Sequence, residues 1–95
     1  MIRRRTFNKA LLPTPARYLD SRGLLPATVR GSWTAIRCPA HKQGGESNPS
    51  LRVSLEDGHF RCMACGIKGG DVLALHRAIT GLSFIEAATE LGAMR

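Results

Sequence analysis

The alternation of apolar and polar residues is clearest over residues 51–61. Residues 51–55 alternate between apolar and polar, which is the period of a half-buried strand. Asp57-Gly58 is a favoured two-residue hairpin turn, and it predicts that Leu55 faces Phe60 and Val53 faces Cys62. Directly opposed residues share a face of the hairpin. The hairpin therefore separates two sets: Leu51, Val53, Leu55 and Phe60 on one face, and Arg52, Ser54, His59 and Arg61 on the other.

The first half of the chain contains a predicted helix and a predicted strand. Thr14 and Pro15 suit the N-cap and the first helical position, and Gly23 suits a helix end, so we expect a helix over about residues 15–22. Residues 32–37 read as a strand, and residues 42–49 as a polar loop. The strand's alternation would place Ile36 on the core side.

Two further helices are expected near the end of the chain. Asp71 is a suitable N-cap for a helix over residues 72–79, which Gly81 would end. Ser83 and Glu86 have capping-box spacing, and they predict a helix that runs to about residue 91. We expect the apolar stripes of both helices to pack against the sheet.

Length and composition limit what this chain can be. Ninety-five residues, 43% of them hydrophobic and only 5% aromatic, support one small core, and cores of this size usually need a metal ion or disulfides. Three cysteines argue against a closed disulfide framework. The chain has no apolar run long enough to span a bilayer and no secretory signal, so we expect a cytoplasmic, nucleoid-associated protein. Residues 1–13 are expected to be a mobile basic arm, 14–92 the domain and 93–95 a short tail.

Charge is distributed unevenly along the chain. The net charge is +7, but residues 1–42 hold nine basic residues against Asp20 alone, a balance of +8. Residues 43–95 hold five basic and six acidic residues, a balance of −1. Such asymmetry favours a polyanionic partner, most often a nucleic acid. The alternative is a basic, solubilising tail with no dedicated partner.

The strongest chemical signal is a pair of short metal-ligand motifs. Cys38 and His41 are three residues apart, as are Cys62 and Cys65, and Gly66 permits a tight turn after the second pair. Two such knuckles provide three thiolates and one imidazole, a usual closed set for structural zinc. A closed set leaves no open position for zinc-dependent hydrolysis.

Other interpretations of these residues remain open. Cys62 and Cys65 could be a redox pair, although the βαβ pattern typical of such sites is missing. Cys38 could be a buried structural residue and His41 a surface residue. His59 could compete as a ligand, but the hairpin places it on the polar face, and His76 lies inside a predicted helix.

Several motifs in fixed order resemble one known family. They are Cys38-Pro39-x-His41, Pro49-Ser50-Leu51-x-Val53, Phe60-x-Cys62-x-x-Cys65-Gly66, Gly69-Gly70-Asp71 and Gly81-Leu82-Ser83-Phe84-x-Glu86-Ala87. They are similar to the CHC2 zinc-binding domain of bacterial and phage DnaG-type DNA primases, over residues 14–92. The resemblance implies a small α+β fold, a zinc ribbon of three or more antiparallel strands flanked by short helices. It also implies that Cys38, His41, Cys62 and Cys65 bind one zinc ion.

In that family the domain grips the single-stranded DNA template, and a separate Toprim-type domain makes the RNA primer. The resemblance therefore implies a non-catalytic part of a DNA primase in DNA replication, with a catalytic chain or a replicative helicase as protein partner. We expect the DNA contacts to come from the polar sheet face and the residues around it: Trp33, Arg37, Lys42, Arg52, His59, Arg61 and Lys68. Trp33 would stack on a base, although burial in the core is an equal alternative.

Two other functions are kept as alternatives. The chain could be a zinc-ribbon adaptor or regulator that contacts protein in a replication or mobile-element system. It could also be a redox or zinc-dependent enzyme, although the closed ligand set disfavours this. The acidic residues are scattered among turns and caps, so we expect no primer synthesis by this chain alone.

Overall fold

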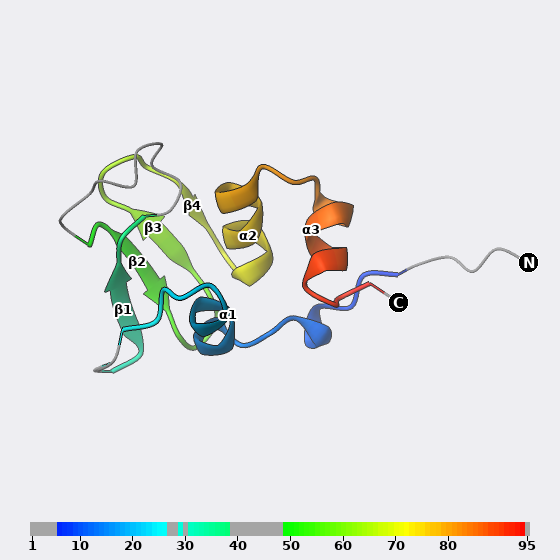
Figure 1. Ribbon diagram of the computed structural model, residues 1–95, viewed down its shortest axis with the longest axis horizontal. Helices are drawn as coiled ribbons and strands as arrows, with labels where there is room; N and C mark the ends of the chain where they lie inside the picture. Colours follow the sequence, from blue (N-terminus) through cyan, green and yellow to red (C-terminus); the bar gives the residue numbers. More distant parts are fainter. Residues whose placement is uncertain (1–5, 27–28, 30, 39–48, 95) are drawn as a thin grey trace, which may run out of the picture.

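The structure, a computed structural model, describes residues 6–26, 29, 31–38 and 49–94 (Figure 1). A four-stranded antiparallel sheet lies at one end, α2 lies beside it and α3 lies beyond α2. The predicted small α+β class is confirmed. The elements are η1 (Lys9–Leu11), α1 (Pro15–Ser21), β1 (Trp33–Ile36), β2 (Leu51–Ser54), β3 (Phe60–Cys62), β4 (Lys68–Gly69), α2 (Val72–Thr80) and α3 (Phe84–Glu90).

All three α-helices begin where their capping residues predict. The side chains of Thr14, Asp71 and Ser83 accept hydrogen bonds from backbone N–H groups in the first turns of α1, α2 and α3. Glu86 completes the capping box by accepting from the backbone N–H of Ser83 at 3.2 Å. Because these contacts are local, sequence spacing was sufficient to predict them.

The hairpin turn differs from the prediction. Val53 pairs with Phe60 and Leu51 with Cys62, so the register is shifted by two residues and the loop holds four residues rather than two. A two-residue Asp-Gly turn needs a positive φ at both positions, but only Gly58 has one, at 85°. The Asp57 carboxylate instead accepts a hydrogen bond from the backbone N–H of His59 at 3.0 Å. This side-chain hydrogen bond stabilises the four-residue loop that forms instead of the two-residue turn.

The alternation of side chains between the two faces is the same in the predicted and the observed register, because a shift of two residues preserves the side-chain period. Leu51, Val53 and Phe60 are buried, whereas Arg52 and Arg61 are exposed and directly opposed. Of the four side chains expected on the polar face, Arg52, His59 and Arg61 are exposed, whereas Ser54 is buried. β4 pairs with β3 and adds Lys68 opposite Arg61.

The core is divided into two clusters. The larger one joins the inner face of the sheet to Tyr18 and Leu19 of α1 and to Val72 and Leu75 of α2. The smaller one is built from Leu73, Ala87, Ala88 and Ala93. The expectation that α3 packs against the sheet is wrong, because its buried alanines belong to the second cluster and α2 lies between α3 and the sheet (Figure 1).

Part of the expected N-terminal arm has defined structure. Phe7 forms a bridge with Met94, and the backbone N–H of Asn8 donates to Ala93 O at 2.8 Å. The Phe7 ring meets Phe84 edge to face, with ring centroids 4.9 Å apart. The apolar side chains of Phe7, Leu11 and Leu12 pack against the second core cluster.

Some sequence predictions lie outside the described residues. They are residues 42–48 of the predicted loop, which include Lys42, and the predicted ligand His41. In the part of the chain that is described, none of the helices is long and apolar enough to cross a membrane.

Candidate metal centre and nucleic-acid face

Three of the four predicted metal ligands lie together in the structure. Cys38 follows β1, Cys62 ends β3 and Cys65 lies in the turn after it. Their Sγ atoms all lie within 4.8 Å of one another. The turn is closed by the backbone N–H of Gly66, which donates to Cys62 O at 3.0 Å. Cys38 reaches the other two cysteines because β1, β2 and β3 are neighbours in the sheet.

The spacing of the thiols fits a tetrahedral zinc ion. With Zn–S bonds of about 2.3 Å, two ligands at the tetrahedral angle lie about 3.8 Å apart. The Sγ atoms of Cys38 and Cys65 are separated by 3.8 Å. Cys38 and Cys62 are buried and Cys65 is exposed, so the centre opens to solvent on one side. The predicted fourth ligand, His41, lies outside the described residues.

The environment of Cys62 favours its thiolate form. Burial raises the pKa of the thiol, but hydrogen bonds from the Ser50 hydroxyl and from the backbone N–H groups of Cys65 and Ala64 outweigh burial and lower the pKa to about 6. The Ser50 Oγ lies 3.4 Å from Cys62 Sγ, and the backbone nitrogen of Cys65 is at the same distance. A thiolate is the form that binds metal, so the local structure prepares this ligand.

The exposed sheet face carries an aromatic ring and several cations. Trp33 opposes Ser54, and Ser54 in turn opposes His59, since the backbone N–H of Ser54 donates to His59 O at 2.7 Å. The next cross-strand row contains Ala35, Arg52, Arg61 and Lys68. Trp33 is 53% exposed, so the alternative that it lies in the core is wrong. Arg37 is also exposed, just beyond the end of β1.

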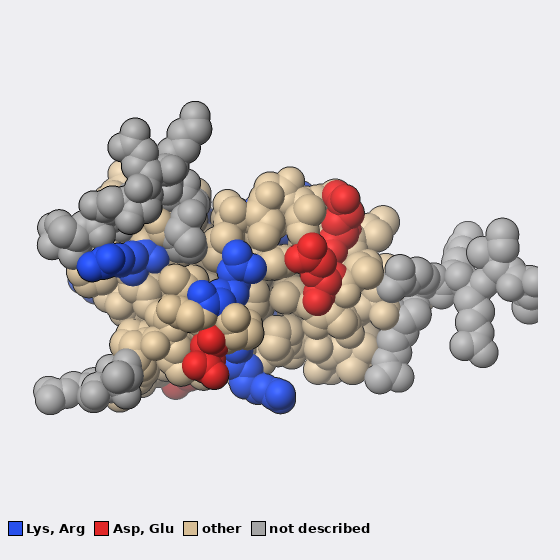
Figure 2. All heavy atoms as spheres, viewed as in Figure 1, with Lys and Arg blue, Asp and Glu red and all other residues tan. Residues whose placement is uncertain are grey.

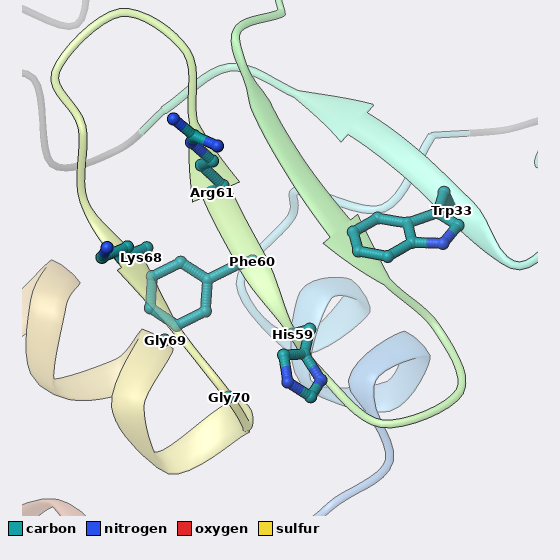
Figure 3. Close-up of a pocket in the computed structure, with 7 residues that line it drawn as sticks. All are labelled: Trp33, His59, Phe60, Arg61, Lys68, Gly69 and Gly70. Carbon is teal, nitrogen blue, oxygen red and sulfur yellow. The ribbon is translucent and has the colours of Figure 1, made fainter.

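A cleft of about 550 Å³ opens on this face (Figure 3). Trp33 of β1 stands on one side, Lys68 of β4 on the other, and His59 and Arg61 lie between them. The remaining lining residues are Phe60, Gly69 and Gly70. This volume lies within the range of small-ligand pockets.

One glycine of the cleft is required by packing. A Cβ atom on Gly69 would lie 2.6 Å from the Phe60 ring and 2.7 Å from Cβ of Ala74. The missing side chain therefore lets the Phe60 ring fill the space between β4 and α2. Gly70 differs, because the nearest atom to a Cβ built there is His59 Nε2 at 3.7 Å.

Acidic side chains are more frequent around α3 than over the sheet on one face of the molecule. On the face seen in Figure 2, basic side chains lie over the sheet and around α1, with one acidic patch among them, and two further acidic patches lie over the region of α3. α3 contributes Glu86 and Glu90, both of which are exposed.

Sequence reasoning missed the short strand β4 and a buried polar contact. Two residues are too few for a detectable alternation. The contact joins Tyr18, His76 and Glu90, where both nitrogens of the His76 ring are hydrogen-bonded. An interior polar residue in a helix gives no indication of its partners when those partners lie on other helices.

Comparison with known proteins shows similarity to DNA primases. The DNA primase of Mycobacterium bovis is 46% identical over 50 residues, which are 53% of this chain and 7% of that protein. The DNA primase of Geobacillus stearothermophilus is 43% identical over 56 residues, or 59% of this chain and 9% of that protein. The gene 58 protein of Mycobacterium phage D29 is 40% identical over 55 residues, 58% of this chain and 40% of that protein. The chain thus matches less than half of the length of each of these relatives.

The family comparison agrees with the geometry of the thiols. The family model described as CHC2 zinc finger matches residues 27–95, which include all four predicted ligand positions. Together with three cysteines positioned around one point, this match supports a structural zinc ion as the cofactor. Because the matched range covers most of the sequence, the chain belongs to the CHC2 zinc-finger family of DNA primases.

Proposed function

We propose that this chain is the single-stranded-DNA-binding module of a DNA primase system, which holds template for a separate catalytic chain or domain. The observation that carries the proposal is the exposed sheet face, where Trp33 lies beside a row of Arg52, Arg61 and Lys68. Aromatic rings for stacking on bases and cations for phosphates are what single-strand binding requires. The similarity to proteins named DNA primase supports a role in a primase system.

Zinc would have a structural role in this proposal. Cys38, Cys62 and Cys65 would hold the ion, with His41 as the fourth ligand, and zinc would supply cross-links between the end of β1 and the turn after β3. Those cross-links would keep β1, and with it Trp33, in place beside the hairpin. With four protein ligands, the ion has no position left for substrate.

Primer synthesis is assigned to a partner in this proposal. In the described residues, the only group of three or more potential metal ligands is the cysteine cluster. Phosphoryl transfer requires oxygen-bound Mg²⁺, which thiolates do not favour. The purified chain should therefore make no primers by itself, and synthesis should require a catalytic primase chain.

DNA binding can be tested by the dependence of affinity on salt. If about four phosphates are neutralised, the slope of log affinity against log salt should be about −3, from roughly −0.7 per phosphate. Arg52→Ala or Arg61→Ala should weaken binding and flatten the slope by up to about one unit. Trp33→Ala should weaken binding with little change of slope, because stacking releases no counterions.

The control is Arg17→Ala, which removes an exposed cation from α1 instead of the sheet. It should have little effect on affinity if the sheet face binds the strand. Deleting residues 2–5, which removes three arginines but keeps Phe7 and Asn8, measures the contribution of the basic N-terminal residues to binding. If this deletion abolishes binding and the Arg52 and Arg61 substitutions do nothing, the sheet face is not the binding site, and a protein-binding zinc adaptor becomes the better interpretation.

A further inference from the structure

Strand β1 lies at the edge of the sheet and bonds a neighbouring strand on one side. The strand order is β1-β2-β3-β4, and β1 is on the side of the sheet that is remote from α2 (Figure 1). The backbone N–H of Leu55 donates to Ser32 O at 2.6 Å, so Ser32 is hydrogen-bonded toward β2. In an antiparallel pair, residues bonded to the neighbouring strand alternate with residues that point away from it. Thr34 and Ile36 therefore also bond β2.

The residues between them direct their backbone N–H and C=O groups out of the sheet. These residues are Trp33, Ala35 and Arg37, and no hydrogen bond within the described residues engages their backbone groups. Apart from its length of four residues, β1 has none of the usual protections of an edge strand, such as a lysine, a proline or a bulge. An unprotected edge of this kind is a template for another strand.

Space for another strand lies beside β1. A cavity of about 360 Å³ borders Ala35, Ile36 and Arg37. Successive residues of a strand point to opposite faces, so a cavity that touches three residues in a row lies beside the strand and not over one face. The remaining lining residues are Gly23, Leu24, Pro26 and Pro49. The segment that precedes β1 therefore leaves the edge open.

A second copy of β1 is complementary to this edge in an antiparallel register centred on Ala35. The register places Ala35 opposite its own copy and Trp33 opposite Arg37 of the second copy, and all three outward-pointing residues then form hydrogen-bonded pairs. Directly opposed side chains lie on one face, with Cβ atoms about 5 Å apart. The guanidinium group of Arg37 can therefore stack on the indole of Trp33 as a cation–π contact. Both side chains are exposed and available for it.

We infer that two copies of this chain pair through β1 and form one continuous antiparallel sheet. The contact is isologous, so it closes as a dimer with two Trp33–Arg37 contacts. Because opposed residues share a face, the polar faces of both sheets lie on the same side of the dimer. The inference goes beyond the proposed function and does not depend on DNA binding. It adds Arg37 of the second copy to the surroundings of Trp33.

Charge and contact size determine the conditions under which this dimer forms. Stable interfaces usually bury about 1,200–2,000 Å², and one short strand from each copy supplies less. The net charge of +7 per chain also opposes association. Salt screens this repulsion, so the dimer should become stronger as the salt concentration rises. Binding to DNA has the opposite salt dependence.

The test is analytical ultracentrifugation of the zinc-loaded protein without DNA. Protein concentrations up to about 1 mM cover weak association. Salt at about 0.1 M and about 1 M changes the screening length from about 10 Å to about 3 Å. The dimer fraction should rise with the concentration of protein and with that of salt. A protein that is monomeric under all these conditions would overturn the inference, and the edge would then suit only an extended segment of another protein.

Ala35→Pro tests the position of the contact. It removes the N–H group that each copy donates at the centre of the pair, and that group bonds nothing within the chain, so β1 should stay paired with β2. Ala35→Pro should be monomeric, whereas Ala35→Ser keeps the N–H group and a small side chain and should still dimerise. Zinc content and cooperative thermal unfolding show whether the proline variant is folded. A dimer that persists in the folded proline variant would place the contact elsewhere.

Arg37→Gln tests the side-chain contact without altering the backbone. Loss of two exposed cation–π contacts should weaken the dimer roughly 5- to 30-fold at about 1 M salt. Arg17→Gln is the matched control, because it removes the same charge from an exposed position on α1 and should leave dimerisation unchanged. Equal dimerisation of the two variants would contradict the register centred on Ala35.

Discussion

The hydroxyl oxygen of Tyr18 lies 2.8 Å from Nδ1 of His76, a contact between residues 58 positions apart that joins α1 to α2. On the other side of the ring, Nε2 lies 2.7 Å from a carboxylate oxygen of Glu90 on α3. A neutral His76 satisfies both partners if the phenol donates to Nδ1 and Nε2–H donates to Glu90. Burial raises the pKa of Tyr18 to about 12, with Arg22 lowering it and Glu90 raising it, so the phenol keeps its proton.

Replacing Tyr18 with Phe should destabilise the protein by about 1–3 kcal/mol, because the buried Nδ1 of His76 loses its partner while the ring packing is kept. Chemical denaturation of the zinc-loaded protein measures the change. Thr89→Val is the matched control, since it removes an exposed hydroxyl that bonds Ile85 O, and it should cost less than about 0.5 kcal/mol. Equal stability of Tyr18→Phe and the unaltered protein would show that the contact contributes nothing.

Removal of the metal should unfold much of the sheet. Structural zinc supplies on the order of 10–16 kcal/mol of apparent binding free energy in small zinc-finger peptides. Elemental analysis should find one zinc per chain, and Cys62→Ala should lose both the metal and cooperative unfolding. Met63→Ala, a change of the exposed neighbouring residue, should keep both. A cooperatively folded protein without metal would contradict this expectation.

The Ser50 hydroxyl should strengthen zinc binding most at mildly acidic pH. It helps to lower the pKa of Cys62 to about 6, so protons compete with zinc only as the pH falls toward 6. Ser50→Ala should raise that pKa, and the thiol would then be protonated at higher pH. Competition titrations with a chelator should show a larger loss of zinc affinity at about pH 6.5 than at about pH 8.5. A loss that is equal at both pH values would point to altered packing instead.

Neighbouring glycines should respond differently to the same substitution. Gly69→Ala places a methyl group against the Phe60 ring and Ala74, and overpacking of this kind costs about 1–3 kcal/mol. Gly70→Ala meets its nearest atom at 3.7 Å, an ordinary contact, so it should leave stability nearly unchanged. Thermal unfolding of both variants distinguishes the two sites. Similar melting temperatures would mean that β4 shifts to accommodate the methyl group.

The amino-acid sequence by itself determined where the helices begin. Thr14, Asp71 and Ser83 begin their helices through contacts that span only three residues, so spacing alone predicts them. The Cys62–Cys65 turn is equally local. The alternation of residues 51–54 determined which side chains share a sheet face, and it did so even with the register in error, because side-chain alternation has a period of two.

The tertiary structure alone decided the features that depend on distant parts of the chain. The approach of Cys38 to Cys65, the exposure of Trp33 and the position of α3 outside the sheet all depend on how whole elements pack. The Tyr18–His76 contact is of the same kind, because each residue alone is compatible with a surface or a core position. Local patterns record the preferences of nearby residues, whereas contacts between distant residues form only when the core closes and selects which apolar faces meet.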